Sequence, residues 1–409
     1  MHLTVFKNTV LLCVLIGISC ASKLKQDPIK EVTIQKHVLD DTKLEVGANQ
    51  TDLYLSLLKG KRVGIVANQT SVIFKNMGYT HLVDSLLSVN VNVKKVFAPE
   101  HGFRGTADAG EVVKDGLDTK TGLPLVSLYG DNKKPKPEQL KDLDIVVFDI
   151  QDVGVRFYTY ISTLHYIMEA CAEAKVPVVI LDRPNPNGQY VDGPTLEVKN
   201  KSFLGMHPIP LVHGMTIGEY VQMINGEHWL ENGIQCSITV IPVKNYTHQT
   251  SYSLPIRPSP NLPNDQAIAL YPSLGLFEGT NINAGRGTEF QFQRYGAPFL
   301  DKNVFTFTYK PVENFGAKYP KHKGQLCYGE DLKDVKVERK VSLKWLIKVY
   351  NNSTDKSKVF NTTNFTLHAG TDQLQKQIEA GLSEDDIKAT WQEDLNRFKK
   401  IREKYLIYK

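Results

Sequence analysis

The sequence has few cysteines and lacks the motifs of common metal and nucleotide sites. Its five cysteines show no Cys-x-x-Cys spacing, so neither a zinc site nor a disulfide framework is indicated. Cys171, Cys236 and Cys327 are compatible with one disulfide or with three buried thiols. No Gly-x-Gly-x-x-Gly follows the first predicted strand and no Walker-type loop occurs, which argues against a nucleotide cofactor. We therefore expect neither a cofactor nor a bound metal.

Long runs of one kind of residue are also missing. The net charge is +5 without a long Lys/Arg block, so nucleic-acid binding is not expected, although the mild positive balance suits an anionic substrate such as a sugar acid. The apolar run at residues 10–16 is too short to span a membrane comfortably. The composition, 41% hydrophobic and 23% charged over 409 residues, is typical of a globular protein of about two domains.

The N-terminus is typical of an export signal. Lys7 precedes the apolar run, and Gly17-Ile18-Ser19-Cys20 follows it. Cys20 stands where a bacterial lipoprotein signal places its lipidated cysteine, although Gly17 replaces the usual leucine; a plain cleaved signal is the alternative. We predict a signal peptide at residues 1–20 and a tether at residues 21–45. The mature protein is then expected to be a bacterial lipoprotein of the periplasm, the outer membrane or the cell surface, with a lipid anchor at Cys20 as its only membrane contact. The oligomeric state is left open.

Short apolar runs that end in polar turns predict a parallel β-sheet. They occupy residues 62–67, 94–98, 144–149 and 177–181, and such runs are typical of strands buried on both faces. Helical patterns lie between them, the clearest at residues 158–175. The predicted fold class is α/β, with a Rossmann-like, doubly wound, mostly parallel sheet at residues 46–245 and a smaller α/β C-terminal domain at 246–409 that closes a cleft.

Polar residues follow several of the predicted strands. In open parallel sheets, ligands bind beyond the carboxyl ends of the strands, so we expect these side chains to meet in one cleft. The candidate residues are Glu100, His101, Asp149 and Asp152 for catalysis, and Arg104, Gln151, Arg156, Tyr158, Arg183, His213, Glu278, Asn281 and Arg286 for substrate binding.

The types of these residues suit acid catalysis on a sugar. Partial desolvation raises the pKa of a carboxyl group toward the range of a general acid, which fits Glu100 at a strand end, with His101 orienting it. Amide, carboxylate, guanidinium and phenol groups at residues 149–158 suit the recognition of sugar hydroxyls by directional hydrogen bonds. The structural alternatives are a Glu100–Arg104 pair, an Asp152 helix cap, an Asp182–Arg183 turn and a Thr216–Glu219 capping box.

Several motifs occur in the order found in one enzyme family. They are APEHGFRG, FDIQDVGVRFYTYISTL, LDRPNP, HGMTIGE, PSPNLP, FEGTN and GRGT. Together they resemble the NamZ-type exo-β-N-acetylmuramidases, a glycoside hydrolase family that was formerly a domain of unknown function. The resemblance extends from about residue 45 to the C-terminal helices. It departs after GRGT, where the family commonly has Pro-Phe and this chain has Glu289-Phe290, so the contacts of that loop are not carried over.

The resemblance implies a Rossmann-like catalytic domain, a smaller C-terminal domain and an active site between them. It implies release of N-acetylmuramic acid (MurNAc) from the non-reducing end of peptidoglycan fragments, so MurNAc-containing glycans or muropeptides are the expected partners. The favoured catalytic acid of the family is the Glu of the EHG motif, which is Glu100 here.

Two roles and three other classes of protein stay open at this point. The group that handles the oxocarbenium side is Asp149, Asp152 or the acetamido group of the substrate. The lactyl carboxylate of MurNAc has three candidate partners, Arg156, Arg183 and Arg286. The alternatives to a glycosidase are a muropeptide-binding lipoprotein without activity and a metal-dependent hydrolase, the latter disfavoured because HxxxH and HExxH spacings are missing. A nucleotide-dependent enzyme is a further alternative, disfavoured by the missing phosphate loop.

Overall fold

The described residues contain a mostly parallel seven-stranded sheet in the N-terminal half of the chain. The structure is a computed structural model, and it describes residues 42–105 and 115–408. The strand order is β5-β6-β4-β1-β7-β8-β9, and neighbouring strands are parallel except β5 and β6. The strands are β1 (Val63–Ala67), β4 (Val93–Ala98), β5 (Gly116–Leu117), β6 (Pro124–Ser127), β7 (Ile145–Asp149), β8 (Val178–Leu181) and β9 (Ile238–Ile241).

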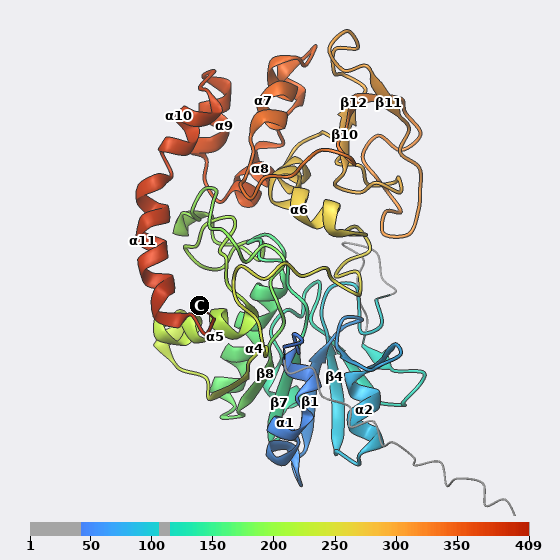
Figure 1. Cartoon of the computed structure of the whole chain (residues 1–409), viewed down its shortest axis with the longest axis vertical. Helices are drawn as coiled ribbons and strands as arrows, with labels where there is room; N and C mark the ends of the chain where they lie inside the picture. The colour runs from blue at the N-terminus through green and yellow to red at the C-terminus, as the bar shows by residue number, and fades with distance from the viewer. Residues whose placement is uncertain (1–41, 106–114, 409) are drawn as a thin grey trace, which may run out of the picture. The chain divides into compact units, whose positions relative to one another are not determined.

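Helices cover both faces of this sheet (Figure 1). They are α1 (Thr51–Leu58), α2 (Leu82–Ser88), the short α3 (Pro137–Leu140), α4 (Tyr160–Glu173) and α5 (Ile217–Gly226). Because successive side chains of a strand point to opposite faces, Val146 and Phe148 of β7 join one apolar cluster with α4 and α5, whereas Ile145 and Val147 join another with α1 and α2. Burial on both faces explains why the strands appear in the sequence as continuous apolar runs.

The predicted fold class is confirmed, and the strand order shows where a ligand site belongs. Numbered along the chain, β6-β4-β1-β7-β8-β9 is the 3-2-1-4-5-6 order of a Rossmann sheet. The predicted runs are confirmed as β1, β4, β7 and β8, and the predicted helix as α4. The order reverses between β1 and β7, so the connections that leave these two strands diverge and a crevice opens beyond the strand ends.

The C-terminal half contains a three-stranded antiparallel sheet among the described residues, in the order β10-β12-β11. Its elements are β10 (Arg294–Ala297), β11 (Phe307–Tyr309), β12 (Cys327–Asp331), α6 (Asp265–Leu274), the 3-10 helix η4 (Gly275–Gly279), α7 (Lys344–Asn351), α8 (Thr362–Ala369), α9 (Gln373–Glu379), α10 (Glu384–Ala389) and α11 (Gln392–Arg402). A small antiparallel pair, β2 (Val72–Phe74) and β3 (Tyr79–His81), lies near α2. The predicted boundary at residues 245–246 stays a prediction.

The C-terminal helices share the core of the parallel sheet. Leu395 and Phe398 of α11 belong to the same apolar cluster as α4 and α5, and α11 descends toward α5 (Figure 1). After α11 the hydroxyl of Tyr405 donates to Glu227 over 2.6 Å. The predicted capping box that begins α5 is confirmed, because the Thr216 and Glu219 side chains each accept from the backbone N–H of the other.

The predicted signal peptide, the lipid-anchor site Cys20 and residues 21–41 of the predicted tether lie outside the described residues. In the part that the structure describes, Cys171, Cys236 and Cys327 are buried free thiols. No helix in residues 42–105 or 115–408 is long and apolar enough to cross a membrane.

A fully buried guanidinium joins the loop after β7 to the C-terminal half. Arg156 is 0% exposed, and its Nη1 donates to the carbonyls of Pro194 and Ile209 over 2.7 and 2.9 Å. Its Nη2 donates to the carbonyls of His368 and Ala369 at the end of α8, over 3.1 and 2.6 Å. Four carbonyls thus replace the water that this cation loses on burial.

We predict that Arg156→Met lowers the free energy of unfolding by about 4 kcal/mol, because several buried carbonyls lose their donor at once. Urea unfolding followed by circular dichroism measures the change. Arg397→Met is the matched control, since Arg397 is 64% exposed on α11, and it should cost less than about 1 kcal/mol. Equal effects of the two substitutions would contradict the role given to Arg156.

Candidate active site

A cavity of about 340 Å³ lies beyond the carboxyl ends of β4, β6 and β7, at the same edge of the sheet as the switch point. This volume is at the small end of the range for ligand sites, and it suits one sugar ring with its substituents. Both halves of the chain contribute walls to the cavity. It is lined by Glu100, His101, Tyr129, Phe157, Tyr158, Thr159, Tyr160, Phe203, Leu204, Ser259, Asn261, Leu262, Tyr271, Glu278, Arg286, Phe292 and His368.

Glu100 stands one residue beyond Pro99 at the end of β4, and hydroxyl groups bind its carboxyl group. Thr159 Oγ1 donates to its Oε2 over 3.2 Å, and the Tyr129 phenol hydrogen-bonds the same carboxyl group. Burial and the Glu100 charge raise the pKa of Tyr129 far above neutrality, so this phenol keeps its proton. Because a hydroxyl both donates and accepts, these partners can serve the carboxylate and the carboxylic acid form of Glu100.

The turn after Glu100 has an uncommon backbone. His101 has a φ of 70° and Gly102 a φ of 76°, and a non-glycine residue in this region is strained unless its surroundings hold it there. The His101 ring is 4% exposed, and its Nε2 lies 3.2 Å from Ser259 Oγ, which also accepts from the Asn261 N–H. The Ser259 hydroxyl thus links the His101 ring to the backbone of the loop that carries Asn261.

The opposite wall carries a second carboxylate, which is paired with cations. Arg286 Nη1 donates to Glu278 Oε1 over 2.8 Å, and Arg286 Nη2 donates to the Gly316 carbonyl over 3.2 Å. Lys321 donates to the carbonyls of Phe277, Glu278 and Thr280. Burial alone would raise the pKa of Glu278, but the charges of Arg286, His368 and Lys321 outweigh it and lower that pKa.

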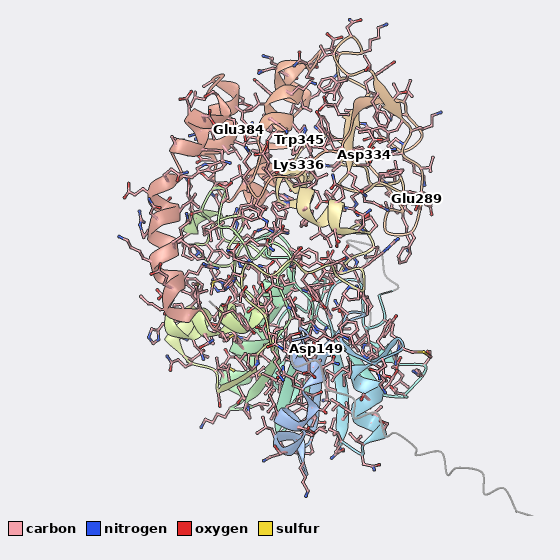
Figure 2. All side chains as sticks on the ribbon, viewed as in Figure 1. Asp149, Glu289, Asp334, Lys336, Trp345 and Glu384 are labelled. Carbon is pink, nitrogen blue, oxygen red and sulfur yellow. The ribbon has the colours of Figure 1, made fainter. Side chains whose placement is uncertain are left out.

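Five of the predicted site residues meet at the cavity: Glu100, His101, Tyr158, Glu278 and Arg286. The phenol of Tyr158 donates to the Pro258 carbonyl over 2.7 Å, and its ring packs edge-to-face on Tyr160. Glu289, where the chain departs from the motif of the resemblance, is exposed (Figure 2) and does not line the cavity. The departure therefore lies outside the described lining of the cavity.

Asp149 and Arg183 lie outside the cavity because they pair with each other. Asp149, labelled in Figure 2, ends β7 and is 0% exposed. Arg183 binds both of its carboxylate oxygens, over 2.6 and 2.9 Å, and also donates to the Val72 carbonyl. A bidentate buried pair leaves neither group for a substrate. The structure thus does not bring the predicted catalytic residue Asp149 or the predicted anion clamp Arg183 to the cavity.

Asp152, Gln151 and His213 also lie outside the cavity lining. Gln151 Nε2 donates to the carbonyls of Asp152 and Pro184, and Asp152 Oδ2 accepts from the Gly154 N–H over 2.6 Å. His213 is 1% exposed rather than facing a cleft, and its Nε2 lies 3.9 Å from Asp152 Oδ2. Burial raises the pKa of Asp152 to about 7 and lowers that of His213 to about 3. These three polar groups support the turn after β7.

The remaining predicted residues have partners elsewhere. Arg156 is committed to backbone carbonyls, so it cannot clamp a lactyl carboxylate. Arg104 binds Asp118 and Asp84, over 2.7–3.2 Å, and not Glu100. Asn281 is exposed, and its amide donates to the Lys358 carbonyl. Of the arginines considered for the lactyl group, Arg286 alone lines the cavity.

Several lining residues were not among the predicted site residues. Tyr129 follows the short strand β6, which the apolar runs did not reveal, and His368 comes from α8, far along the chain. Ser259 and Asn261 belong to the PSPNLP motif, and Thr159 and Tyr160 to the motif after β7, so attention to the hydroxyl and amide groups of those motifs would have found them.

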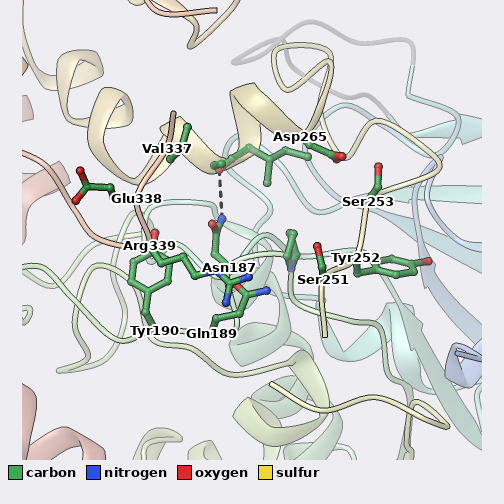
Figure 3. A pocket seen from close by; sticks show the side chains of 13 residues that line it. Asn187, Gln189, Tyr190, Ser251, Tyr252, Ser253, Asp265, Val337, Glu338 and Arg339 are labelled. Atoms are coloured by element: carbon green, nitrogen blue, oxygen red, sulfur yellow. Dashed lines mark hydrogen bonds between the residues drawn. The ribbon is translucent and has the colours of Figure 1, made fainter. Parts of the chain in front are cut away.

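A second cavity, of about 220 Å³, lies between residues 186–190, 251–253, 337–339 and α6 (Figure 3). Asn187 Nδ2 donates to the Ile268 carbonyl there and ties the loop to α6. None of the predicted site residues lines this cavity.

Among the described residues, Glu169, Glu173 and Glu231 form a group with metal-ligand spacing, but Lys134 already binds Glu169 and Glu173 over 2.8 and 2.7 Å.

The sheet is of the Rossmann type, and a sugar-sized cavity with two carboxyl groups lies at the edge that carries its switch point. These features place the chain among α/β proteins that are suited to glycoside chemistry. Family models described as the N-terminal and C-terminal parts of the exo-β-N-acetylmuramidase NamZ match residues 63–266 and 269–408. The chain belongs to the NamZ family.

Relatives of known sequence and structure agree with this assignment. A peptidoglycan β-N-acetylmuramidase NamZ of Bacillus subtilis is 40% identical over 374 residues, which are 87% of this chain and 89% of that protein. Two crystal structures of DUF1343 family proteins from Bacteroides fragilis are similar. One is 47% identical with a TM-score of 0.82 and covers 90% of this chain and 99% of its own; the other is 28% identical with a TM-score of 0.74 and covers 90% and 100%.

The buried Asp152 makes stability depend on pH. Its pKa is about 7 in the folded protein against an ordinary value of 3.8. Between about pH 4 and pH 7 the carboxyl group is therefore ionised in the unfolded chain and still protonated in the folded protein. The free energy of unfolding falls as pH rises through this range, because the unfolded chain binds fewer protons. We predict that Asp152→Asn is more stable than the wild type at pH 8, by on the order of 2–4 kcal/mol, and that the difference vanishes near pH 4.

Thermal unfolding midpoints between pH 4 and 8 test this prediction. Asp334→Asn, at an exposed position (Figure 2), is the control and should follow the wild type at every pH. An Asp152→Asn protein that is less stable than the wild type at pH 8 would show that the ionised carboxylate is favourable in the fold.

Proposed function

We propose that this protein is an exo-acting β-N-acetylmuramidase that releases MurNAc from the non-reducing end of peptidoglycan fragments, with Glu100 as general acid. The observation that carries the proposal is the position of Glu100: it lines a one-sugar cavity at the edge of the sheet that carries its switch point, in a chain of the NamZ family. The B. subtilis relative is named for action on peptidoglycan.

In the proposed reaction, Glu100 gives its proton to the glycosidic oxygen as the bond to MurNAc breaks. The Thr159 and Tyr129 hydroxyls fix the direction of the carboxyl group. The strained turn at His101 is held by the contact with Ser259, and it fixes the backbone position from which the Glu100 side chain extends. Aromatic side chains such as Tyr158 and Tyr271 form much of the lining, and apolar walls of this kind exclude water and pack on the faces of sugar rings.

Arg286 is the proposed partner of the lactyl carboxylate, which distinguishes MurNAc from N-acetylglucosamine (GlcNAc). Its guanidinium has five N–H donors, and the bonds to Glu278 and Gly316 use Nη1 and Nη2 once each. The donors that remain can bind a second carboxylate from the side of the cavity. This proposal replaces Arg156 and Arg183, which are engaged in the fold.

The size of the cavity also supports exo action, because a pocket for one sugar admits a chain end and not the middle of a chain. Export, with or without a lipid anchor at Cys20, stays a prediction of the sequence; it would place the enzyme where cell-wall glycans are. Release of GlcNAc-headed fragments and free MurNAc would assign the protein to turnover or recycling of the wall.

We predict that Glu100→Gln lowers turnover of a MurNAc–GlcNAc disaccharide by roughly 10²–10⁴-fold, since an amide cannot act as the acid. Mass spectrometry of the products, with and without chelator, measures the reaction and tests the metal-dependent alternative. Glu313→Gln, a change at an exposed ion pair outside the cavity, is the control. Wild-type protein that binds the disaccharide and yields no product would favour the binding-lipoprotein alternative instead.

A further inference from the structure

We propose that Glu278 is the second catalytic carboxylate of this cavity, the one that acts in its ionised form on the positively charged sugar centre. This inference rests on the proposed function and assigns the group that the sequence left open. Among the described residues that line the cavity, the acidic side chains are Glu100 and Glu278.

The carboxylates expected from the sequence are excluded by their contacts. Both oxygens of Asp149 bind Arg183 below the cavity. Asp152 is 4% exposed, does not line the cavity and accepts from the Gly154 N–H. A carboxylate that stabilises a sugar cation has to face it without water in between, and neither aspartate has access to the cavity.

Glu278 has that access. It belongs to η4, in the half of the chain that does not supply Glu100, so the two glutamates enter the cavity from different walls. Its side chain is 26% exposed. Arg286 bonds Oε1, and Oε2 is left for the substrate.

The two glutamates line the same cavity, and their charges act on the same neighbours. Burial and the charges of Glu278 and Glu100 together raise the pKa of Tyr271, whose ring lines the cavity. The charge of Glu278 also contributes to raising the pKa of Tyr129, the hydrogen-bond partner of Glu100. A carboxylate in the wall of a water-poor cavity interacts strongly with a cation that develops in it.

The surroundings of the two glutamates differ in the way that a glycosidase requires. Glu100 accepts from the Thr159 hydroxyl, and a hydroxyl can serve either protonation state, whereas the carboxylate of Glu278 is bound by the cation Arg286 and its backbone carbonyl accepts from Lys321. The Arg286 pair thus favours the ionised form of Glu278, which is the form that the second carboxylate of a glycosidase needs.

The step balances with water as the co-reactant. The C1–O bond breaks, and its electron pair leaves with the glycosidic oxygen, which takes the proton of Glu100. The positive charge on C1 and the ring oxygen faces the carboxylate of Glu278. Water then adds its oxygen to C1 and returns one proton to a carboxylate of the enzyme, so the protein ends the cycle with the protons it began with.

The test compares Glu278→Gln with Glu100→Gln on two β-glycosides of MurNAc. One has GlcNAc as the leaving group, which needs a proton, and the other has 2,4-dinitrophenolate, which does not. Glu278→Gln should lose at least about 10³-fold in kcat on both substrates. Glu100→Gln should lose about as much on the disaccharide and regain most of its activity on the dinitrophenyl glycoside. Glu313→Gln is the control for the Glu to Gln change.

Azide gives a second readout that a structural role would not produce. Glu278→Ala leaves room beside C1, so azide should raise its turnover of the dinitrophenyl glycoside at least about tenfold and form the α-azide of MurNAc, opposite in configuration to the substrate. Anomeric proton NMR identifies that product. Thermal unfolding checks that the variants fold without the full Arg286 pair.

The inference is overturned if Glu278→Gln keeps kcat within tenfold of the wild type on both substrates, or if its defect is confined to KM, which would make Glu278 a binding residue. It is also overturned if Glu278→Gln, like Glu100→Gln, recovers on the dinitrophenyl glycoside. Wild-type protein that cleaves neither substrate would instead refute the proposed function itself.

Discussion

A single buried cation holds together the two walls of the cavity. Arg156 begins in the turn after β7, next to the residues that line one wall, and its Nη2 ends on the carbonyls of His368 and Ala369 in α8. His368 is itself part of the other wall. Because a buried guanidinium cannot give up its carbonyl partners without a large cost in free energy, the loop after β7 and α8 keep a fixed spacing, and the width of the cavity follows from it.

The two glutamates that line the cavity have different hydrogen-bond partners. The Rossmann half offers Glu100 neutral hydroxyl groups, and the C-terminal half offers Glu278 cations. The two carboxyl groups thus come to the cavity from different halves of the chain. The parallel sheet supplies strand ends for one group, and the C-terminal half supplies the other.

Much of the fold could be predicted because a strand buried on both faces must be apolar along its whole length. The runs ending at Ala98 and Asp149 are read correctly for that reason. The same pattern does not reveal which polar side chain at a strand end faces the crevice and which is buried against partners inside the fold. Arg183 is buried because it forms a bidentate pair with Asp149. Arg156 is buried because it donates to carbonyls from three distant segments.

The sequence by itself determined the sheet, the place of the crevice and the position of Glu100 at its edge, because these follow from apolar periodicity and from the rule that ligands bind beyond parallel strand ends. Tertiary structure alone decided which charged groups remain available to a ligand. Charge pairing can join atoms that are far apart in the chain, as Asp149 with Arg183 shows, and no local pattern encodes such partners.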